Sequence, residues 1–279
     1  MDTRIARAVR RCTTSLVLAG LSGTMGAAQA VPLSFSASGS NPAGIQATVD
    51  AFRADLGAVN ANVTGSFVTG RREINWDGVP DALSSPFALP GNFFNSNSPR
   101  GVLLTTPGSG FQVSATAASG VTVRFGNIDA SYSAEFQTFS PQRLFTAIGS
   151  NVTDVTFFVP GSTTPSRTRG FGAVFADVDL PSVTSLSFFD VNNVLLDTLF
   201  VPAGPNNGLS FLGADYGASV VSRVRITSGN AALGAPEGGN DLVVMDDFIY
   251  AEPVPEPGMV GLLVAGAIGL SLARRRRRV

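Results

Sequence analysis

Glycine and proline turns divide residues 31–252 into short runs of β-branched and aromatic residues, and this spacing sets the fold class. The runs that predict strands are VTVRF (121–125), DVTFFV (154–159), GAVFADV (172–178), SLSFF (185–189), LLDTLFV (195–201), SRVRIT (222–227) and LVVMDDFIY (242–250). With 31 glycines and 17 prolines, the chain has turn residues enough to join many short strands. We predict one all-β domain, a β-sandwich of jelly-roll type.

One segment has the period of a helix rather than that of a strand. Asn41 and Pro42 are typical of a helix N-terminus, and Gly57 is typical of its end. Four apolar residues between them fall on one helical face: Ile45, Val49, Phe52 and Leu56. We expect a short N-terminal amphipathic helix that packs against the sheet.

The near-neutral charge of the chain conceals an acidic body. Four of the 19 arginines lie in the first 11 residues, and five occupy positions 274–278. The remaining ten arginines face 19 acidic residues once Asp2 is set aside, a net charge of −9. This balance lacks the basic footprint of a nucleic-acid binder, so we expect no nucleic-acid partner.

The residue types that are missing exclude several mechanisms. The chain has no histidine and no lysine, which removes Ser-His-Asp triads, histidine metal ligands, Ser-Lys dyads and phosphate-binding loops of the Walker type. Its single cysteine, Cys12, lies near the N-terminus. A glycosidase with two carboxylates is left open, but no spacing singles out a pair of acids. We therefore expect no enzyme.

Residues 1–30 have the three parts of a secretory signal peptide. An arginine-rich start precedes an apolar stretch at 16–21, and small residues end in Ala28-Gln29-Ala30. We expect signal peptidase to cleave after Ala30, so that the exported protein begins at Val31. The alternative is a short N-terminal anchor.

The C-terminus carries a second membrane signal. Residues 258–273 form a run of 16 residues without a charge, which predicts a transmembrane helix slightly shorter than usual. By the positive-inside tendency, the arginines that follow would stay in the cytoplasm and stop transfer: Arg274, Arg275, Arg276, Arg277 and Arg278. Pro255, Glu256 and Pro257 precede the run, and two prolines favour an extended segment at the outer face.

The order Pro-Glu-Pro, apolar run and arginine cluster resembles the sorting tail of the PEP-CTERM proteins of Gram-negative bacteria. The resemblance covers residues 253–279, and it implies recognition by exosortase, a membrane-embedded cysteine transpeptidase, with cleavage near the motif. It also implies bacteria that make exopolysaccharide or biofilm matrix. A plain tail anchor is the alternative.

These signals predict where the protein goes. We expect a non-catalytic body (31–252) that is anchored in the inner membrane before processing and then reaches the cell surface or the matrix. One rival is a carbohydrate-binding adhesin that binds exopolysaccharide, and another is a glycan-cleaving enzyme. Sugar stacking would have to use one of the chain's few Trp and Tyr residues: Trp76, which we assign to the core, Tyr132, Tyr216 and Tyr250.

Carboxylates supply the best local chemistry of the body. Strand alternation places Asp246 on one face with Val244 and Phe248, and Asp247 on the other, so one carboxylate adjoins the core. Ca²⁺ takes six to eight oxygen ligands, so a calcium ion is a candidate cofactor. The candidate ligands are Asp246, Asp247, Asp177, Asp179 and Asp241. Alternatively, Arg223, Arg225 or backbone amides satisfy these aspartates.

Overall fold

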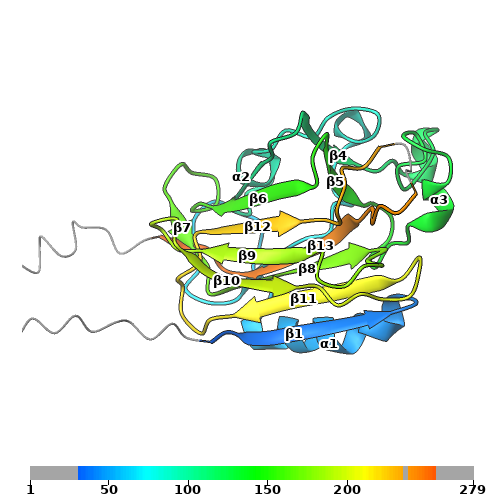
Figure 1. The fold of residues 1–279 in the computed structure, drawn as a ribbon. Coiled ribbons are helices and arrows are strands. Elements are labelled where there is room, and N and C mark those ends of the chain that lie inside the picture. Colours follow the sequence, from blue (N-terminus) through cyan, green and yellow to red (C-terminus); the bar gives the residue numbers. More distant parts are fainter. Residues whose placement is uncertain (1–30, 235–237, 256–279) are drawn as a thin grey trace, which may run out of the picture.

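Two antiparallel sheets packed face to face form the framework of the protein, and a helix covers the outer face of the larger sheet (Figure 1). The computed structural model describes residues 31–234 and 238–255. The predicted all-β sandwich is confirmed, because side chains from both sheets interleave in one core.

The larger sheet has seven strands in the order β1-β11-β8-β13-β5-β4, with β2 paired to β13 beside β5. Its strands are β1 (Leu33–Gly39), β2 (Arg71–Ile74), β4 (Gly110–Val113), β5 (Phe145–Ile148), β8 (Gly170–Ala176), β11 (Leu209–Asp215) and β13 (Val244–Ala251). All of the pairings are antiparallel.

The smaller sheet has five strands in the order β10-β9-β12-β6-β3. They are β3 (Val102–Thr105), β6 (Val152–Phe157), β9 (Ser185–Phe189), β10 (Leu195–Phe200) and β12 (Arg223–Thr227). On β12, Val224 and Ile226 are buried, whereas Arg223 and Arg225 point outward and pair with Asp154 of β6. One face of this sheet therefore lies in the core and the other faces solvent, and we call the latter the wet face.

Short elements complete the structure. A two-stranded sheet joins β7 (Ser166–Arg167) to β14 (Val254–Pro255). The helices are α1 (Pro42–Leu56), α2 (Phe93–Ser96) and α3 (Tyr132–Glu135), and single 3-10 turns occupy Asp81–Leu83 and Ala117–Ser119. None of the helices in the described residues has the length and hydropathy of a membrane span.

Aromatic rings dominate the core between the two sheets. Trp76 is buried there as expected, stacked on Phe145 with ring centroids 4.1 Å apart and edge-on to Phe248. Its indole Nε1 donates to the backbone oxygen of Asp246 at 2.8 Å, so the polar handle of the ring is satisfied. Rings of both sheets meet where Phe157 contacts Phe171.

A second core lies on the other face of the seven-stranded sheet. The helix predicted between Asn41 and Gly57 is confirmed as α1, with Ile45, Val49, Phe52 and Leu56 buried against the sheet. Phe52 packs against Phe35 of β1 and Phe211 of β11. The segment from Phe125 to Leu144, which includes α3, covers the remainder of this face.

One predicted strand is wrong. Residues 121–125 form a bend and a turn, in which Arg124 and Phe125 adopt left-handed backbone angles (φ 51° and 66°) that no strand contains. The Arg124 side chain donates to the carbonyl oxygens of Ser133 and Phe136, and the Phe125 ring is buried in the second core. Tertiary packing has overridden the strand propensity of this run.

Candidate functional site

A buried ion pair fixes the C-terminal end of the fold. Glu252 directly follows β13, and Arg72 lies on β2. Arg72 Nε donates to Glu252 Oε2 at 2.7 Å and Nη2 donates to Oε1 at 2.9 Å, with Arg72 0% and Glu252 3% exposed. Two charges removed from water in this way must be fully hydrogen-bonded, and a bidentate fork meets that need.

The loop between α1 and β2 (residues 57–70) supplies most of the further partners of this pair. Glu252 also accepts hydrogen bonds from Asn60 Nδ2 at 2.8 Å and from the Phe67 amide at 3.2 Å. Arg72 donates to backbone carbonyl oxygens of Ala61, Val63, Gly65 and Pro99. The ion pair therefore holds loop 57–70 against the last residues of the fold.

The chain stays attached to the body beyond Glu252. Ser66 Oγ donates to the carbonyl oxygen of Pro253 at 2.5 Å, and β14 pairs Val254 with Arg167 and Pro255 with Ser166. These contacts lie beyond residue 252 and include the first proline of the Pro-Glu-Pro motif. We call the end of the sandwich around Glu252 and β14 the exit end (Figure 1).

The other predicted sorting residues lie outside the described residues. These are the signal-cleavage residues Ala28 and Ala30, the motif residues Glu256 and Pro257, the apolar run 258–273 and the cluster Arg274, Arg275, Arg276, Arg277 and Arg278.

A hollow of about 300 Å³ opens at the exit end. It lies between loop 57–70 and the final residues of the fold, and its lining includes Leu56, Val68, Gly70, Arg169, Glu252 and Val254. Arg169 is held there by an ion pair with Asp215. The charged groups of this lining are therefore already matched within the protein.

The predicted placement of Asp246 and Asp247 on opposite faces is wrong. Met245 pairs with Phe175 and Phe248 pairs with Ala173, so the two aspartates together oppose one residue of β8. This is a β-bulge, which inserts one extra residue and suspends the two-residue alternation. Both carboxyls consequently point to the same side of the strand, where each contacts the hydroxyl of Ser140.

The two carboxyls have different partners. Asp246 Oδ2 accepts from the Phe139 amide at 2.6 Å, whereas Asp247 Oδ2 accepts from Arg53 Nη2 of α1 at 3.0 Å. Burial raises the pKa of both groups, and the charge of Asp247 adds to the effect at Asp246, whose pKa lies well above its usual value. Asp246 therefore has the more strongly raised pKa of the two, and Asp247 has the guanidinium of Arg53 beside it.

The remaining candidate ligands gather at the opposite end of the sandwich, where β8 ends and β13 begins; we call this the far end. Asp241 accepts from the amides of Asp179 at 3.1 Å and Leu180 at 3.3 Å, and Asp177 accepts from the Asn207 amide at 2.7 Å. Burial, reinforced by the nearby Asp179 and other acidic groups, raises the pKa of Asp177 to about 7. In the described part of the chain, arginines pair with neither Asp177 nor Asp241.

The five candidate calcium ligands are thus split between two places. Asp246 and Asp247 lie beneath α1, and the other three lie at the far end. There, Asp177 and Asp241 already accept hydrogen bonds from backbone amides. Residues 31–234 and 238–255 contain no group of three or more Asp, Glu, Cys or His side chains arranged to hold a metal ion. Of the alternative partners that we predicted for these aspartates, the backbone amides are present. Arg223 and Arg225 form ion pairs with Asp154 instead.

The aromatic residues considered for sugar stacking are also inside the protein. Trp76, Tyr132, Tyr216 and Tyr250 are all buried, and the Tyr250 hydroxyl donates to the carbonyl oxygen of Arg100 at 2.9 Å. Stacking on a sugar ring requires an exposed aromatic face, which these four residues do not offer.

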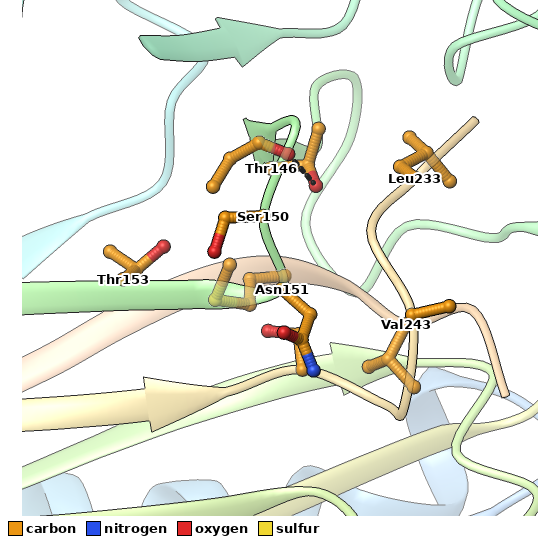
Figure 2. Close-up of a pocket in the computed structure, with 10 residues that line it drawn as sticks. Thr146, Ser150, Asn151, Thr153, Leu233 and Val243 are labelled. Atoms are coloured by element: carbon orange, nitrogen blue, oxygen red, sulfur yellow. Dashed lines mark hydrogen bonds between the residues drawn. The ribbon is translucent and has the colours of Figure 1, made fainter. Parts of the chain in front are cut away.

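A second hollow has polar walls but no room for a ligand (Figure 2). The gaps between its side chains are too narrow for a water molecule. Among residues 31–234 and 238–255, the hydroxyls of Thr153 and Ser228 that line it have no hydrogen-bond partners, and Asn151 Nδ2 donates to the carbonyl oxygen of Gly229. This hollow is a packing defect beside β5 and β6 rather than a binding site.

Comparison with known proteins adds one distant likeness. No protein family and no curated protein matches the chain. A structural match is a glycoside hydrolase family 43 arabinoxylan arabinofuranohydrolase from Bacillus subtilis, solved in complex with cellotetraose. The match has a TM-score of 0.24 and 19% identity, and it covers 43% of this chain and 24% of that one. At this TM-score the likeness carries no argument about fold or function.

The sequence analysis missed the Arg72–Glu252 pair. The signal was the position of Arg72, two residues before Ile74 and four before Trp76, in the buried phase of β2. An arginine in that phase requires a buried acid as its partner. Which acid it meets depends on the pairing of β2 with β13, which joins residues 180 apart in the sequence.

Proposed function

We propose that this protein is exported, held transiently in the inner membrane by residues 258–273, and processed by exosortase to become a cell-surface or matrix protein. Its jelly-roll-like β-sandwich is a non-catalytic body, and residues 253–279 are its sorting signal. The order of signals in the sequence supports this proposal, and so do the contacts that the body makes up to Pro255.

The observation that carries the proposal is the position of Pro255. The body holds the chain by the Arg72–Glu252 pair, by the Ser66–Pro253 hydrogen bond and by β14, up to the first residue of the Pro-Glu-Pro motif. The contacts of the body therefore reach the first proline of the sorting motif. Cleavage beyond Pro255 would remove the tail without breaking any of these contacts.

The burial of four aspartates argues against a catalytic role for them. A glycosidase needs two carboxyls that flank the bond of a bound sugar. Asp246 and Asp247 lie beneath the helix-covered face, and Asp177 and Asp241 are buried at the far end. A glycan cannot reach any of the four without unfolding the structure around them.

The experiment is intact-mass analysis of the protein from a host that contains an exosortase. We expect a product that begins at Val31 and lacks Arg274 to Arg278. The variant Glu256→Ala should retain the span and accumulate the unprocessed form, while the matched variant Glu135→Ala, a half-buried acid on α3, should be processed normally. A mature protein that still carries the arginine cluster would refute exosortase processing and leave a plain anchor.

A further inference from the structure

The two ends of the described chain lie at the same end of the sandwich. β1 begins with Leu33 opposite Asp215, and Asp215 pairs with Gly170, where β8 begins. The neighbouring Arg167 pairs with Val254 of β14. The chain therefore enters the body at the exit end and leaves it there, as Figure 1 shows.

Exposed apolar side chains concentrate at this end. The described residues expose twelve large apolar side chains, and nine of them belong to the N-terminal start, loop 57–70 or the turn between β9 and β10. These nine are Val31, Leu33, Val59, Val63, Phe67, Val68, Val191, Val194 and Leu195. The β9–β10 turn joins the exit end through Ser222, which donates to the carbonyl oxygen of Asp190 and directly follows Val221, the partner of Thr168. Leu180 and Phe200 lie at the far end, and Phe87 lies in the loop before α2.

Loop 57–70 presents its apolar side chains from a fixed backbone. Val68 is 93% exposed and Phe67 is 40% exposed, yet the Phe67 amide donates to Glu252 and the adjacent Ser66 side chain donates to Pro253. Because the backbone of this loop is hydrogen-bonded to the body, its apolar side chains are exposed in an ordered loop. Apolar groups that gather on a surface in this way mark an interaction site.

The predicted membrane span begins close to this surface in the sequence. The uncharged run 258–273 begins three residues after Pro255, and three extended residues span at most about 10 Å. A body tethered so closely to a membrane span must turn its exit end toward the bilayer. The apolar groups around that exit then meet the interface between headgroups and acyl chains, where apolar and aromatic side chains are stabilised.

We propose that the exit end is a lipid-facing surface, and that loop 57–70 inserts Phe67 and Val68 into the outer interface of the inner membrane while the chain is anchored. The inference rests on the proposed function, because the span at 258–273 brings the surface to the bilayer. Its occupant is the phospholipid interface. Docking holds the body in one orientation, with the far end directed away from the membrane.

The test places a fluorescent label on the full chain in a Cys12→Ser background, reconstituted in vesicles of phosphatidylethanolamine and phosphatidylglycerol that include brominated lipids. The label is attached at Val68→Cys, and the matched control is Phe200→Cys, which is 52% exposed at the far end. We expect the bromines to quench the label at 68 and not at 200. Added salt should leave this quenching unchanged, because the contact is apolar.

Flotation of the vesicles separates the two proposals. A chain that floats with a label unquenched at 68 would overturn the lipid-facing surface and leave the anchor intact. A chain that does not float would overturn the anchor and the docking together. Label-to-label contact between two chains at position 68, without quenching by lipid, would assign the surface to a second copy and would also refute the proposal.

Discussion

Glu252 and Asp177 are both buried carboxyls just beyond strands of the same sheet, yet the protein satisfies them in different ways. At the exit end, Glu252 meets the guanidinium of Arg72, and Asp215 meets that of Arg169. At the far end, Asp177 and Asp241 meet backbone amides. Beneath α1 the two solutions stand side by side, since Asp247 meets Arg53 while Asp246 meets the Phe139 amide.

The difference teaches how an acidic body without histidine responds to pH. An arginine stays charged at every accessible pH, so the partner of Glu252 does not change its own charge as the pH changes. A buried carboxyl held by amides alone has a raised pKa, as Asp177 has, and exchanges a proton in the neutral range. The stability of the far end should therefore respond to pH in the neutral range.

The largest expected effect comes from removing the arginine at the exit end. Arg72→Met leaves the Glu252 charge buried without its partner, and we expect a loss of about 3–5 kcal/mol in the free energy of unfolding. Urea unfolding at neutral pH measures it. The matched control is Arg225→Met on the wet face, whose partner Asp154 keeps Arg223, with an expected loss of about 1 kcal/mol or less. Equal losses in the two variants would contradict the assignment of the exit pair as a structural clamp.

The aspartate pair beneath α1 tests the comparison within one site. Asp247→Asn removes the charge that Arg53 meets, so we expect a loss of about 1.5–3 kcal/mol. Asp246 accepts from the Phe139 amide, and the side-chain oxygen of an asparagine can still accept from it, so the loss for Asp246→Asn should stay below about 1 kcal/mol. Unfolding curves of the two variants at neutral pH decide the order. A larger loss for Asp246→Asn would mean that the charge resides on Asp246.

The contribution of the far end to stability should depend on pH. The pKa of Asp177 rises from 3.8 in the unfolded chain to about 7 in the fold, so its contribution to stability is full below pH 3.8 and is lost as the pH rises to 7. Asp177→Asn cannot lose a proton, and asparagine tolerates the left-handed backbone at this position (φ 68°). The melting temperature of the variant should match that of the original at pH 4 and exceed it by roughly a few degrees at pH 8. A difference that does not depend on pH would refute the assignment.

The smallest expected effect concerns calcium. Because amides and Arg53 already satisfy the buried aspartates, we expect the same melting midpoint in EDTA, in millimolar Ca²⁺ and in Mg²⁺. A site saturated at about 100 times its Kd would instead stabilise the fold by about 2.7 kcal/mol. A higher melting midpoint with Ca²⁺ alone would show that the body binds calcium. Asp→Asn changes at 241 and 247 would then locate the site.

Local patterns in the sequence predicted the parts of the fold that depend on local physics. The α1 helix was predicted from first to last residue, because its turn residues and its apolar face follow one period. The bulge at Asp246 was missed because strand alternation assumes a regular ladder, which an extra residue interrupts. The turn at 121–125 was missed because β-propensity cannot report the packing of Arg124 and Phe125.

The candidate site was less predictable than the fold for the same reason. Both motif prolines could be recognised in the sequence, but only the structure shows that the first of them belongs to β14. The Arg72–Glu252 pair and the Arg53–Asp247 pair each depend on which strands become neighbours. A buried charge in a strand can be recognised from its phase, whereas its partner requires the topology.

The attachment at the exit end also determines how the protein would carry mechanical load. A pull on the C-terminus would first strain β14, whose two residues form a short pair that peels open easily. The load would then pass through the Arg72–Glu252 clamp into β13, which is hydrogen-bonded to β8 on one side and to β2 on the other. A tethered body would therefore yield in two steps, a weak one that lengthens the tether and a strong one that spares the sandwich until the clamp breaks.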